Sequence, residues 1–299
     1  MTTLLLTGRT GQTGWELQRA LAPLGQVIAT GRGELDLADP DSIRAAIRQA
    51  KPAIIVNAGA FTSVDDVERQ PELAMRVNGV APGVIAEEAK RLGALLVHYS
   101  TAYVFDGNSP RPYAEDDPPN PVNVYGRSKL AGEQAIAAAG CDHLILRTSW
   151  IYGFRGINFL TTILKLARER KELPVVDDQI GSPTWARVIA QATAELLQRR
   201  EFITRHGGVY HLAASGHTSR YEFARAIIDI MKEVSGFPNG WASVKPIGSA
   251  AYPLPAKRPC NSMLSKDRIE RDYGIVLPHW RIQVHAFLRE LAASGHWTR

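Results

Sequence analysis

Short apolar segments alternate with longer stretches of helical periodicity along the first half of the chain. The short segments are rich in aliphatic and β-branched residues and are bounded by turn residues, which is typical of strands. They predict strands at 3–7, 27–30, 53–57, 95–100, 143–148 and 209–213. The longer stretches predict helices at 42–49, 71–92, 125–139, 158–170, 185–199, 219–234 and 281–291.

Local signals mark the start of two of these helices. Asp39 and Pro40 supply a cap and a first-turn proline before the helix at 42–49. Ser219 and Glu222 have the spacing of a capping box. Asn78 is a poor helix former inside the helix at 71–92. A buried amide needs partners, so we expect Asn78 either to bridge to the helix at 125–139 or a strand, or to have a structural role.

Composition narrows the class of protein. The 299 residues are 45% hydrophobic and 22% charged, as in a globular protein. The net charge of +5 includes no basic block, so we expect no nucleic-acid partner. Cys141 and Cys260 form no disulfide framework, which favours a reducing cytosol. No segment resembles a signal peptide or a membrane span, and no compact cluster of metal ligands is visible. We therefore expect a cytoplasmic protein with no membrane partner and no metal.

A glycine-rich loop joins the first predicted strand to a helical pattern. Its first glycine permits a tight turn, its second lets a pyrophosphate approach the backbone, and its third lets helix and strand pack closely. Strand, loop and helix in this order predict a dinucleotide site at the helix N-terminus. The loop residues expected to contact the cofactor are Gly8, Arg9, Thr10, Gly11, Gln12, Thr13 and Gly14.

The next two predicted strands end in further residues suited to this cofactor. The second strand ends in Arg32, where an NAD site usually places an acidic residue. Arg32 and Arg9 suit the 2′-phosphate of NADPH, with NADH left open. Asp36 and Leu37 are expected to flank the adenine, and Asn57 to reach the ribose or phosphate region. The small residues expected to lie against the cofactor are Ala58, Gly59 and Ala60.

The order of elements favours an α/β fold, a Rossmann-like doubly wound parallel sheet with helices on both faces. We expect the dinucleotide-binding domain at 1–150, with the chain returning to it at about 184–213. A smaller C-terminal substrate-binding lobe is expected from 151–183 and 214–299, with 236–258 irregular because it is rich in Gly, Pro and Ser.

A tyrosine and a lysine lie four residues apart in the helix predicted at 125–139, and so on one face of it. They are Tyr125 and Lys129. An ammonium beside a phenol favours the phenolate, so we expect Lys129 to lower the pKa of Tyr125 from its usual value of about 10. Tyr125 would then be a proton donor near neutral pH, with Thr101 as its partner at the end of an apolar run.

Seven segments carry a resemblance along the whole length: GRTGQTGWELQ, VNAGAFTSVDDVE, STAYVFDG, NVYGRSKLAGE, LRTSWIYG, DQIGSPTWA and RPCNSMLS. Together they resemble the extended short-chain dehydrogenase/reductase superfamily and, within it, the dTDP-4-dehydrorhamnose reductase family. The resemblance implies that NADPH reduces carbon 4 of a dTDP-bound 4-keto sugar to give dTDP-L-rhamnose, the last step of dTDP-rhamnose synthesis. Tyr125 would protonate the alkoxide, Lys129 would hold the nicotinamide ribose, and Thr101 would donate to the same oxygen.

The resemblance also implies a substrate site for a dTDP-sugar. Trp150 and Asn158 would hold the sugar, and Arg258 would pair with the diphosphate. The other expected contacts are Thr101, Ala102, Tyr103 and Asn261. Ala102 departs from the family, which usually has aspartate there. We expect the missing carboxylate to slow turnover. The oligomeric state is left open, with a homodimer as one alternative.

Two other functions compete with this one. A dehydratase of the same fold would carry an Asp-Glu pair where this chain has Ala102 and Tyr103. An epimerase would keep NAD tightly bound, whereas Arg32 favours an exchangeable NADPH. A non-catalytic NADP-binding regulatory subunit is the alternative from another class. The intact Thr101, Tyr125 and Lys129 favour the reductase.

Overall fold

The computed structural model describes residues 1–294, which form the following strands and helices. The strands are β1 (Thr3–Thr7), β2 (Gln26–Thr30), β3 (Ile54–Asn57), β4 (Leu95–Thr101), β5 (His143–Thr148), β6 (Ile151–Tyr152), β7 (Glu172–Val176), β8 (Ile180–Gly181), β9 (Thr184–Trp185), β10 (Gly208–His211), β11 (Thr218–Ser219) and β12 (Ser243–Ile247). The helices are α1 (Gln12–Leu21), α2 (Pro40–Ala50), α3 (Val64–Arg69), α4 (Pro71–Ala74), α5 (Ala81–Leu92), α6 (Val124–Ala139), α7 (Phe159–Glu169), α8 (Ala186–Gln198), α9 (Arg200–His206), α10 (Arg220–Ser235), α11 (Asp267–Tyr273) and α12 (Trp280–Ala293).

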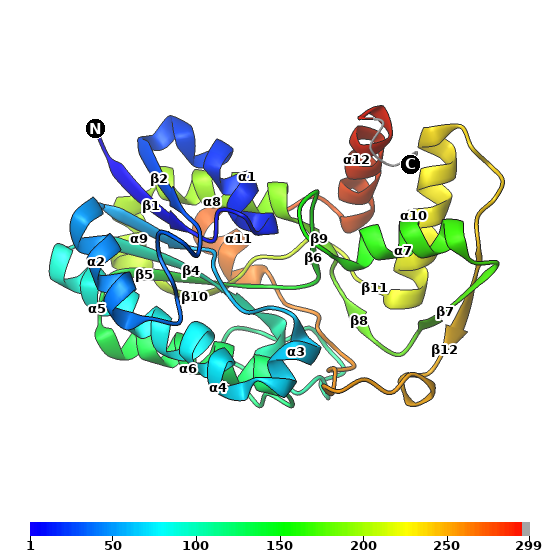
Figure 1. The fold of residues 1–299 in the computed structure, drawn as a ribbon, viewed down its shortest axis with the longest axis horizontal. Coiled ribbons are helices and arrows are strands. Elements are labelled where there is room, and N and C mark those ends of the chain that lie inside the picture. Colours follow the sequence, from blue (N-terminus) through cyan, green and yellow to red (C-terminus); the bar gives the residue numbers. More distant parts are fainter. Residues whose placement is uncertain (295–299) are drawn as a thin grey trace.

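Six parallel strands form the central sheet in the order β10-β5-β4-β3-β1-β2 (Figure 1). The strand order reverses beside β1, because the chain passes from β1 to β2 on one side and then to β3 on the other. Ligands of such sheets bind at this reversal, at the carboxyl ends of the strands. The predicted α/β class with a Rossmann-like parallel sheet is confirmed. Residues 295–299 of the predicted lobe lie outside the described residues.

Alternation along the strands places helices on both faces of the sheet. Leu4 and Leu6 of β1 join a core that includes Leu17 of α1. Leu5, between them, packs on the opposite face with Ile43 of α2. The cap predicted for α2 forms, since the side chain of Asp39 accepts a hydrogen bond from the backbone N–H at the second helical position. Both faces of β1 are thereby buried, as a central parallel strand requires.

The helix predicted at 71–92 forms as α4, a π-helical segment at Met75–Val80, and α5. Asn78 lies buried in the π-helical segment. Its amide accepts from the backbone N–H of Phe61 and donates to the carbonyl of Phe61, at 2.9 Å each. It also donates to Ser128 of α6 at 3.2 Å. The bridge to the helix predicted at 125–139 is therefore confirmed.

A second, smaller lobe follows β5 in the chain and contains β7, β12, α7, α10 and α12 (Figure 1). It has a core of its own, to which these helices and strands contribute Leu160, Leu173, Phe223, Ile227 and Phe287. The prediction that 236–258 is irregular is wrong for its middle, where β12 pairs in parallel with β7. β12 forms because an edge of β7 is available, and a local sequence pattern does not reveal that partner.

No helix within residues 1–294 is both long and apolar enough to cross a membrane. In the same part of the chain, both cysteines are free, with Cys141 buried and Cys260 exposed.

Candidate active site

A cleft opens at the carboxyl ends of β1, β2 and β3, where the strand order reverses. Gly8 adopts φ +72°, which favours glycine, and a Cβ there would lie 2.7 Å from the backbone of Gly59. A Cβ on Gly14 would lie 2.1 Å from the carbonyl oxygen of Gly8, so the third glycine lets α1 pack onto the loop. The predicted cofactor residues that line this cleft are Gly8, Thr10, Gly11, Arg32, Asp36, Leu37, Ala58, Gly59 and Ala60. Gln12, Thr13 and Gly14 form the first turn of α1.

The charges around the cleft differ from those predicted. Arg9, expected to add a second positive charge, pairs with Glu34 at 2.7 Å and donates to the carbonyl of Ala29 at 3.1 Å. Glu34 also accepts from the backbone N–H of Gly31 at 2.9 Å. That backbone hydrogen bond, together with Arg9, lowers the pKa of Glu34. Arg32 lines the cleft, is exposed, and makes no ion pair within residues 1–294. Arg32 is therefore the available cation at this end of the cleft.

Asn57 lies below the cleft surface. Its amide oxygen accepts from Thr7 at 2.6 Å, and its amide nitrogen lies 3.0 Å from Nδ1 of His98. Thr7 in turn accepts from the backbone N–H of Gly59 at 3.1 Å. The side chain of Asn57 is buried and contacts Thr7 at the end of β1 and His98 in the middle of β4. Its contact with the cofactor ribose or phosphate remains a prediction.

The predicted catalytic residues lie at the end of β4 and on α6. Asn123 caps α6, accepting from the backbone N–H of Gly126 at 2.8 Å, and this places Tyr125 in the first turn. The side chain of Thr101 lies close enough to the Tyr125 hydroxyl to lower its pKa. Lys129 lies one turn further along the same helix and is only 2% exposed. The fold thus brings the three residues together beside the cleft.

The acid–base state of Tyr125 differs from the prediction. Burial raises its pKa to about 12, and the side chain of Thr101 opposes this only in part. The predicted net lowering of this pKa is wrong, because desolvation of the phenol outweighs any nearby positive charge. Lys129 donates to the carbonyl of Tyr99 at 2.6 Å and lies 3.0 Å from Nε2 of His98. Burial lowers the pKa of Lys129 to about 8, against the opposing charge of Glu133.

The sequence analysis did not identify one cation, Arg220, which lies beside the predicted substrate residue Trp150. The guanidinium of Arg220, at the start of α10, stacks 3.7 Å above the ring centre of Trp150 and 4.8 Å from that of Phe159. The guanidinium also lies close enough to Tyr103 for that side chain to favour its charge. The ring of Tyr103 packs edge-on against Tyr125 at 5.9 Å. Burial lowers the pKa of Arg220, and no carboxylate pairs with it within residues 1–294. No local sequence pattern identifies Arg220 as a site residue, because the residues that it contacts lie far away in the chain.

Trp150 has a strained backbone. Its φ of +46° is rare for a bulky residue. A Cβ on Gly181 would lie 2.5 Å from the Trp150 indole, so the glycine makes room for the ring. Such strain clusters at functional sites. The predicted placement of Trp150 beside the substrate is consistent with this geometry and is still untested.

Arg258 is held by an acid from the sheet domain. Its guanidinium donates to both oxygens of Asp65, at 2.7 and 2.9 Å, and to the carbonyl of Ala256 at 2.6 Å. The Arg258 contact lowers the pKa of Asp65. Arg258 also lies close enough to Arg220 to disfavour the charge of that group. Two guanidinium groups and one carboxylate therefore lie close to one another.

Three other predicted substrate residues are buried and contact other parts of the protein. Ala102 is 1% exposed in an apolar cluster with Phe105 and Leu264, because the short 3-10 helix after β4 turns its methyl inward. Substrate contact by Ala102, like the effect of its missing carboxylate on turnover, remains a prediction. Asn158 caps α7, accepting from Thr161 at 3.1 Å and donating to a carbonyl at 2.8 Å. Asn261 is buried and donates to two backbone carbonyls of the loop at 109–111. Substrate contact by these two asparagines remains a prediction.

Comparison with known proteins places this architecture in a family. The model of the family described as "RmlD substrate binding domain" matches residues 1–293. A relative from Burkholderia thailandensis named dTDP-4-dehydrorhamnose reductase is 48% identical over 296 residues, covering 97% of this chain and 99% of the relative. The reductase of the same name from Escherichia coli K12 is 43% identical, covering 96% and 97%.

A solved structure agrees with these relatives. It is the dTDP-4-dehydrorhamnose reductase of Bacillus anthracis in complex with NADP, which superposes with a TM-score of 0.89 at 32% identity, covering 97% of this chain and all of that one. The chain belongs to the RmlD substrate binding domain family, the family of the dTDP-4-dehydrorhamnose reductases.

Proposed function

We propose that this protein uses NADPH to reduce the 4-keto group of a dTDP-4-dehydro-6-deoxy-L-sugar, giving dTDP-L-rhamnose. The observation that carries the proposal is the meeting of Thr101, Tyr125 and Lys129 beside the glycine-loop cleft, in a chain of this reductase family. The relative that is solved with NADP supports the choice of cofactor.

The glycine-loop cleft would hold the cofactor. Gly8 and Gly59 leave room for close backbone approach, and the first turn of α1 presents free N–H groups to a pyrophosphate. Arg32 would contact the 2′-phosphate, since it follows β2, is exposed, and makes no ion pair with any residue between 1 and 294. When bound, NADPH supplies the hydride that reduces carbon 4.

Tyr125 would supply the proton. Because burial holds its pKa near 12, its phenol keeps that proton at neutral pH until an alkoxide develops beside it. The hydride forms the new C–H bond, and the proton from Tyr125 forms the O–H bond. The resulting phenolate is stabilised by the hydroxyl of Thr101 and by the positive charge of Lys129 one turn away.

Arg220 and Arg258 would hold the diphosphate of the dTDP-sugar. Within residues 1–294, Arg220 has no carboxylate partner, and Arg258 shares the charge of Asp65. An anion beside them would balance the local charge. We expect Arg220→Met to weaken binding of dTDP by about 10- to 100-fold, the value of hydrogen bonds to a charged group. Arg225→Met, on the exposed face of the same helix, is the control. Equal dTDP affinities in the two variants, measured by calorimetry, would remove Arg220 from the site.

The activity itself is tested by adding a dTDP-4-keto-6-deoxy-L-sugar and NADPH to the protein. We expect loss of NADPH absorbance in step with the appearance of dTDP-L-rhamnose. A protein that binds both compounds yet consumes no NADPH would contradict the proposal. A homodimer stays a prediction, which analytical ultracentrifugation tests.

A further inference from the structure

A line of buried polar groups runs from the cofactor cleft to the catalytic lysine. It begins at Thr7, continues through Asn57 to Nδ1 of His98, and passes from Nε2 of His98 to Lys129. The three steps measure 2.6, 3.0 and 3.0 Å. The line ends at the carbonyl of Tyr99, 2.6 Å from the Lys129 nitrogen. His98 is 1% exposed.

The imidazole in the middle of this line has one donor and one acceptor. Burial, and then the charge of Lys129, hold the pKa of His98 well below its usual value, so the ring is neutral. An ammonium donates and never accepts. A charged Lys129 must therefore donate to Nε2, which places the ring proton on Nδ1 and requires the oxygen of the Asn57 amide to face it. A neutral Lys129 fits the reverse order, in which Nε2–H donates to the amine and the Asn57 amide nitrogen donates to Nδ1, the amide orientation described above. The charged form therefore requires the Asn57 amide to turn over, so that its oxygen accepts from Nδ1–H and its nitrogen donates to Thr7.

We propose that His98 is a positioning residue for the reduction. The lone pair of its Nε2 accepts a hydrogen bond from the Lys129 ammonium and holds it beside Tyr125. This role rests on the reductase function proposed above. It also links the charge of Lys129 to the amide orientation of Asn57 and, through Thr7, to the backbone of Gly59 in the cofactor cleft.

Few other groups influence the charge of Lys129. Glu133, one turn further along α6, favours the ammonium, but it is bound by Arg147 at 2.7 Å and by Ser100 of β4. Tyr125 lies one turn before Lys129 and holds its proton. From β4, the hydroxyl of Tyr99 is bonded to Thr193 at 2.7 Å. His98 is thus the side chain of β4 that meets the lysine nitrogen.

The basic limb of the pH–rate profile tests this role. Lys129 has a pKa of about 8, so turnover is expected to fall as pH rises through that region. His98→Leu removes an acceptor from the ammonium, which lowers the lysine pKa further and moves the limb to lower pH by about one to two pH units. His98→Gln restores an acceptor oxygen, so its limb should return toward that of the wild type.

His211→Leu is the matched control, since His211 is a second buried imidazole whose Nδ1 contacts the carbonyl of Ser265 at 3.0 Å, away from Lys129. We expect that variant to lower the melting temperature and leave the limb in place. A His98→Leu limb that coincides with that of the wild type, in protein that still binds NADPH, would overturn the proposal. So would a His98→Gln limb displaced as far as that of His98→Leu.

Nitrogen-15 NMR of the wild-type protein gives a second test that needs neither a variant nor turnover. Below the lysine pKa of about 8, the proton of His98 should reside on Nδ1, and Nε2 should carry the shift of an unprotonated nitrogen. A proton on Nε2 throughout that range would overturn the proposal, even if both His98 variants failed to fold. Because the tautomer is observed without substrate, this result is separate from success or failure of the reductase assay.

Discussion

Because its pKa is raised, Tyr125 is protonated at neutral pH and can donate one proton. Tyr125→Phe keeps the ring that packs against Tyr103 and removes only the hydroxyl. We expect turnover to fall by about 10²–10⁴-fold, the usual contribution of general acid catalysis. Steady-state kinetics with the dTDP-4-keto sugar measures this, and NADPH affinity serves as the internal control because it should be unchanged. A variant that keeps most of the wild-type turnover would show that the proton comes from elsewhere.

Arg32 is the residue on which we expect the choice between NADPH and NADH to depend. Arg9 is paired with Glu34, whereas Arg32 is exposed and has no ion-pair partner within residues 1–294. Arg32→Ala should lower kcat/KM with NADPH by about 10- to 100-fold and leave NADH nearly unaffected. Raising the salt concentration should weaken NADPH more than NADH in the wild type. Equal losses with both cofactors would show that Arg32 does not contact the 2′-phosphate.

The sequence could predict that the candidate catalytic residues Tyr125 and Lys129 share one helix face, but it could not predict their electrostatics. Helical spacing alone placed Tyr125 and Lys129 on one face of α6. The direction of the Tyr125 pKa depends on how deeply the phenol is buried, which no local pattern reveals. His98 and Arg220 were missed for a related reason, since their partners lie far away in the chain.

Caps and turns fix the elements that carry the site. Asn158 starts α7 with a full capping box, in which Thr161 bonds back to the backbone N–H of the cap. Asn158→Ala should lower the free energy of unfolding by about 1 kcal/mol, within the usual range of 0.5–2. Denaturant titration measures this loss.

The same variant separates the cap from the predicted sugar contact. If Asn158 acts only as a cap, Asn158→Ala leaves the KM for the dTDP-sugar unchanged, and Asn158→Asp, which can still cap, restores most of the stability. A large rise in KM with unchanged stability would instead assign Asn158 to the sugar.

Element prediction succeeded where the signal was local. The predicted strands at 3–7 and 143–148 match β1 and β5, because each is a short apolar run bounded by turn residues. The helix at 71–92 was predicted without its π-helical segment, which forms around Asn78 as this residue bonds to Phe61 and Ser128. β12 was missed because it depends on pairing with β7.

At the scale of the molecule, two cores meet beside the cleft, and polar contacts join them. Asp65 of α3 holds Arg258, which follows the lobe's last strand. Asn123, the cap of α6, donates to the carbonyl of Lys257 at 2.7 Å. The alternation of strands and helices predicted the sheet. It did not predict the contacts that join the sheet domain to the lobe, because the residues that make them lie far apart in the sequence. Helix α6 and the smaller lobe are therefore connected directly.

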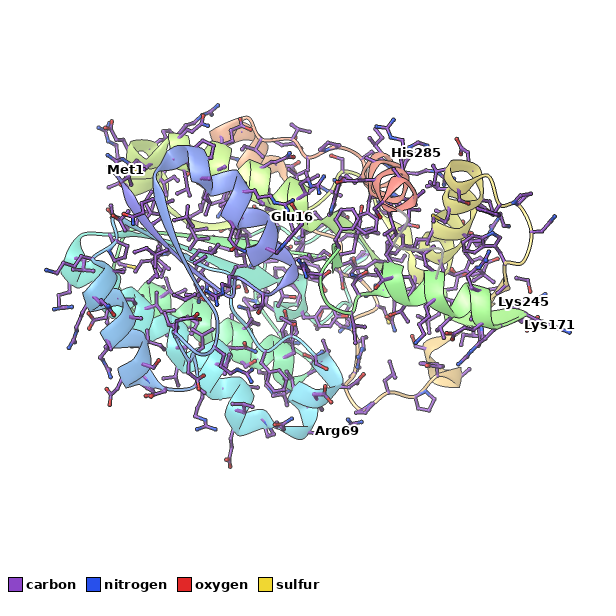
Figure 2. All side chains as sticks on the ribbon, turned by 45° about the horizontal axis from the view of Figure 1, so that its top comes forward. Met1, Glu16, Arg69, Lys171, Lys245 and His285 are labelled. Carbon is purple, nitrogen blue, oxygen red and sulfur yellow. The ribbon has the colours of Figure 1, made fainter. Side chains whose placement is uncertain are left out.

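An arginine on α8 makes a second connection between the two cores. Arg187 pairs with Glu16 of α1 at 3.2 Å and with Glu290 of α12 at 2.6 Å. Figure 2 labels Glu16 on α1 and His285 on α12, the two helices that Arg187 joins. Glu16 is only 4% exposed, so its carboxylate depends on this arginine.

We expect Arg187→Met to destabilise the protein by about 3 kcal/mol, because it leaves the Glu16 charge buried and unpaired. Methionine retains apolar contact with the ring of Trp185, over which the guanidinium lies at 4.5 Å. Arg225→Met breaks an exposed pair within α10 and should change stability little. Adding Glu16→Gln to Arg187→Met removes the unpaired charge and should recover part of the loss. Thermal denaturation of the four proteins measures these effects, and an Arg187→Met variant as stable as Arg225→Met would show that the connection contributes nothing.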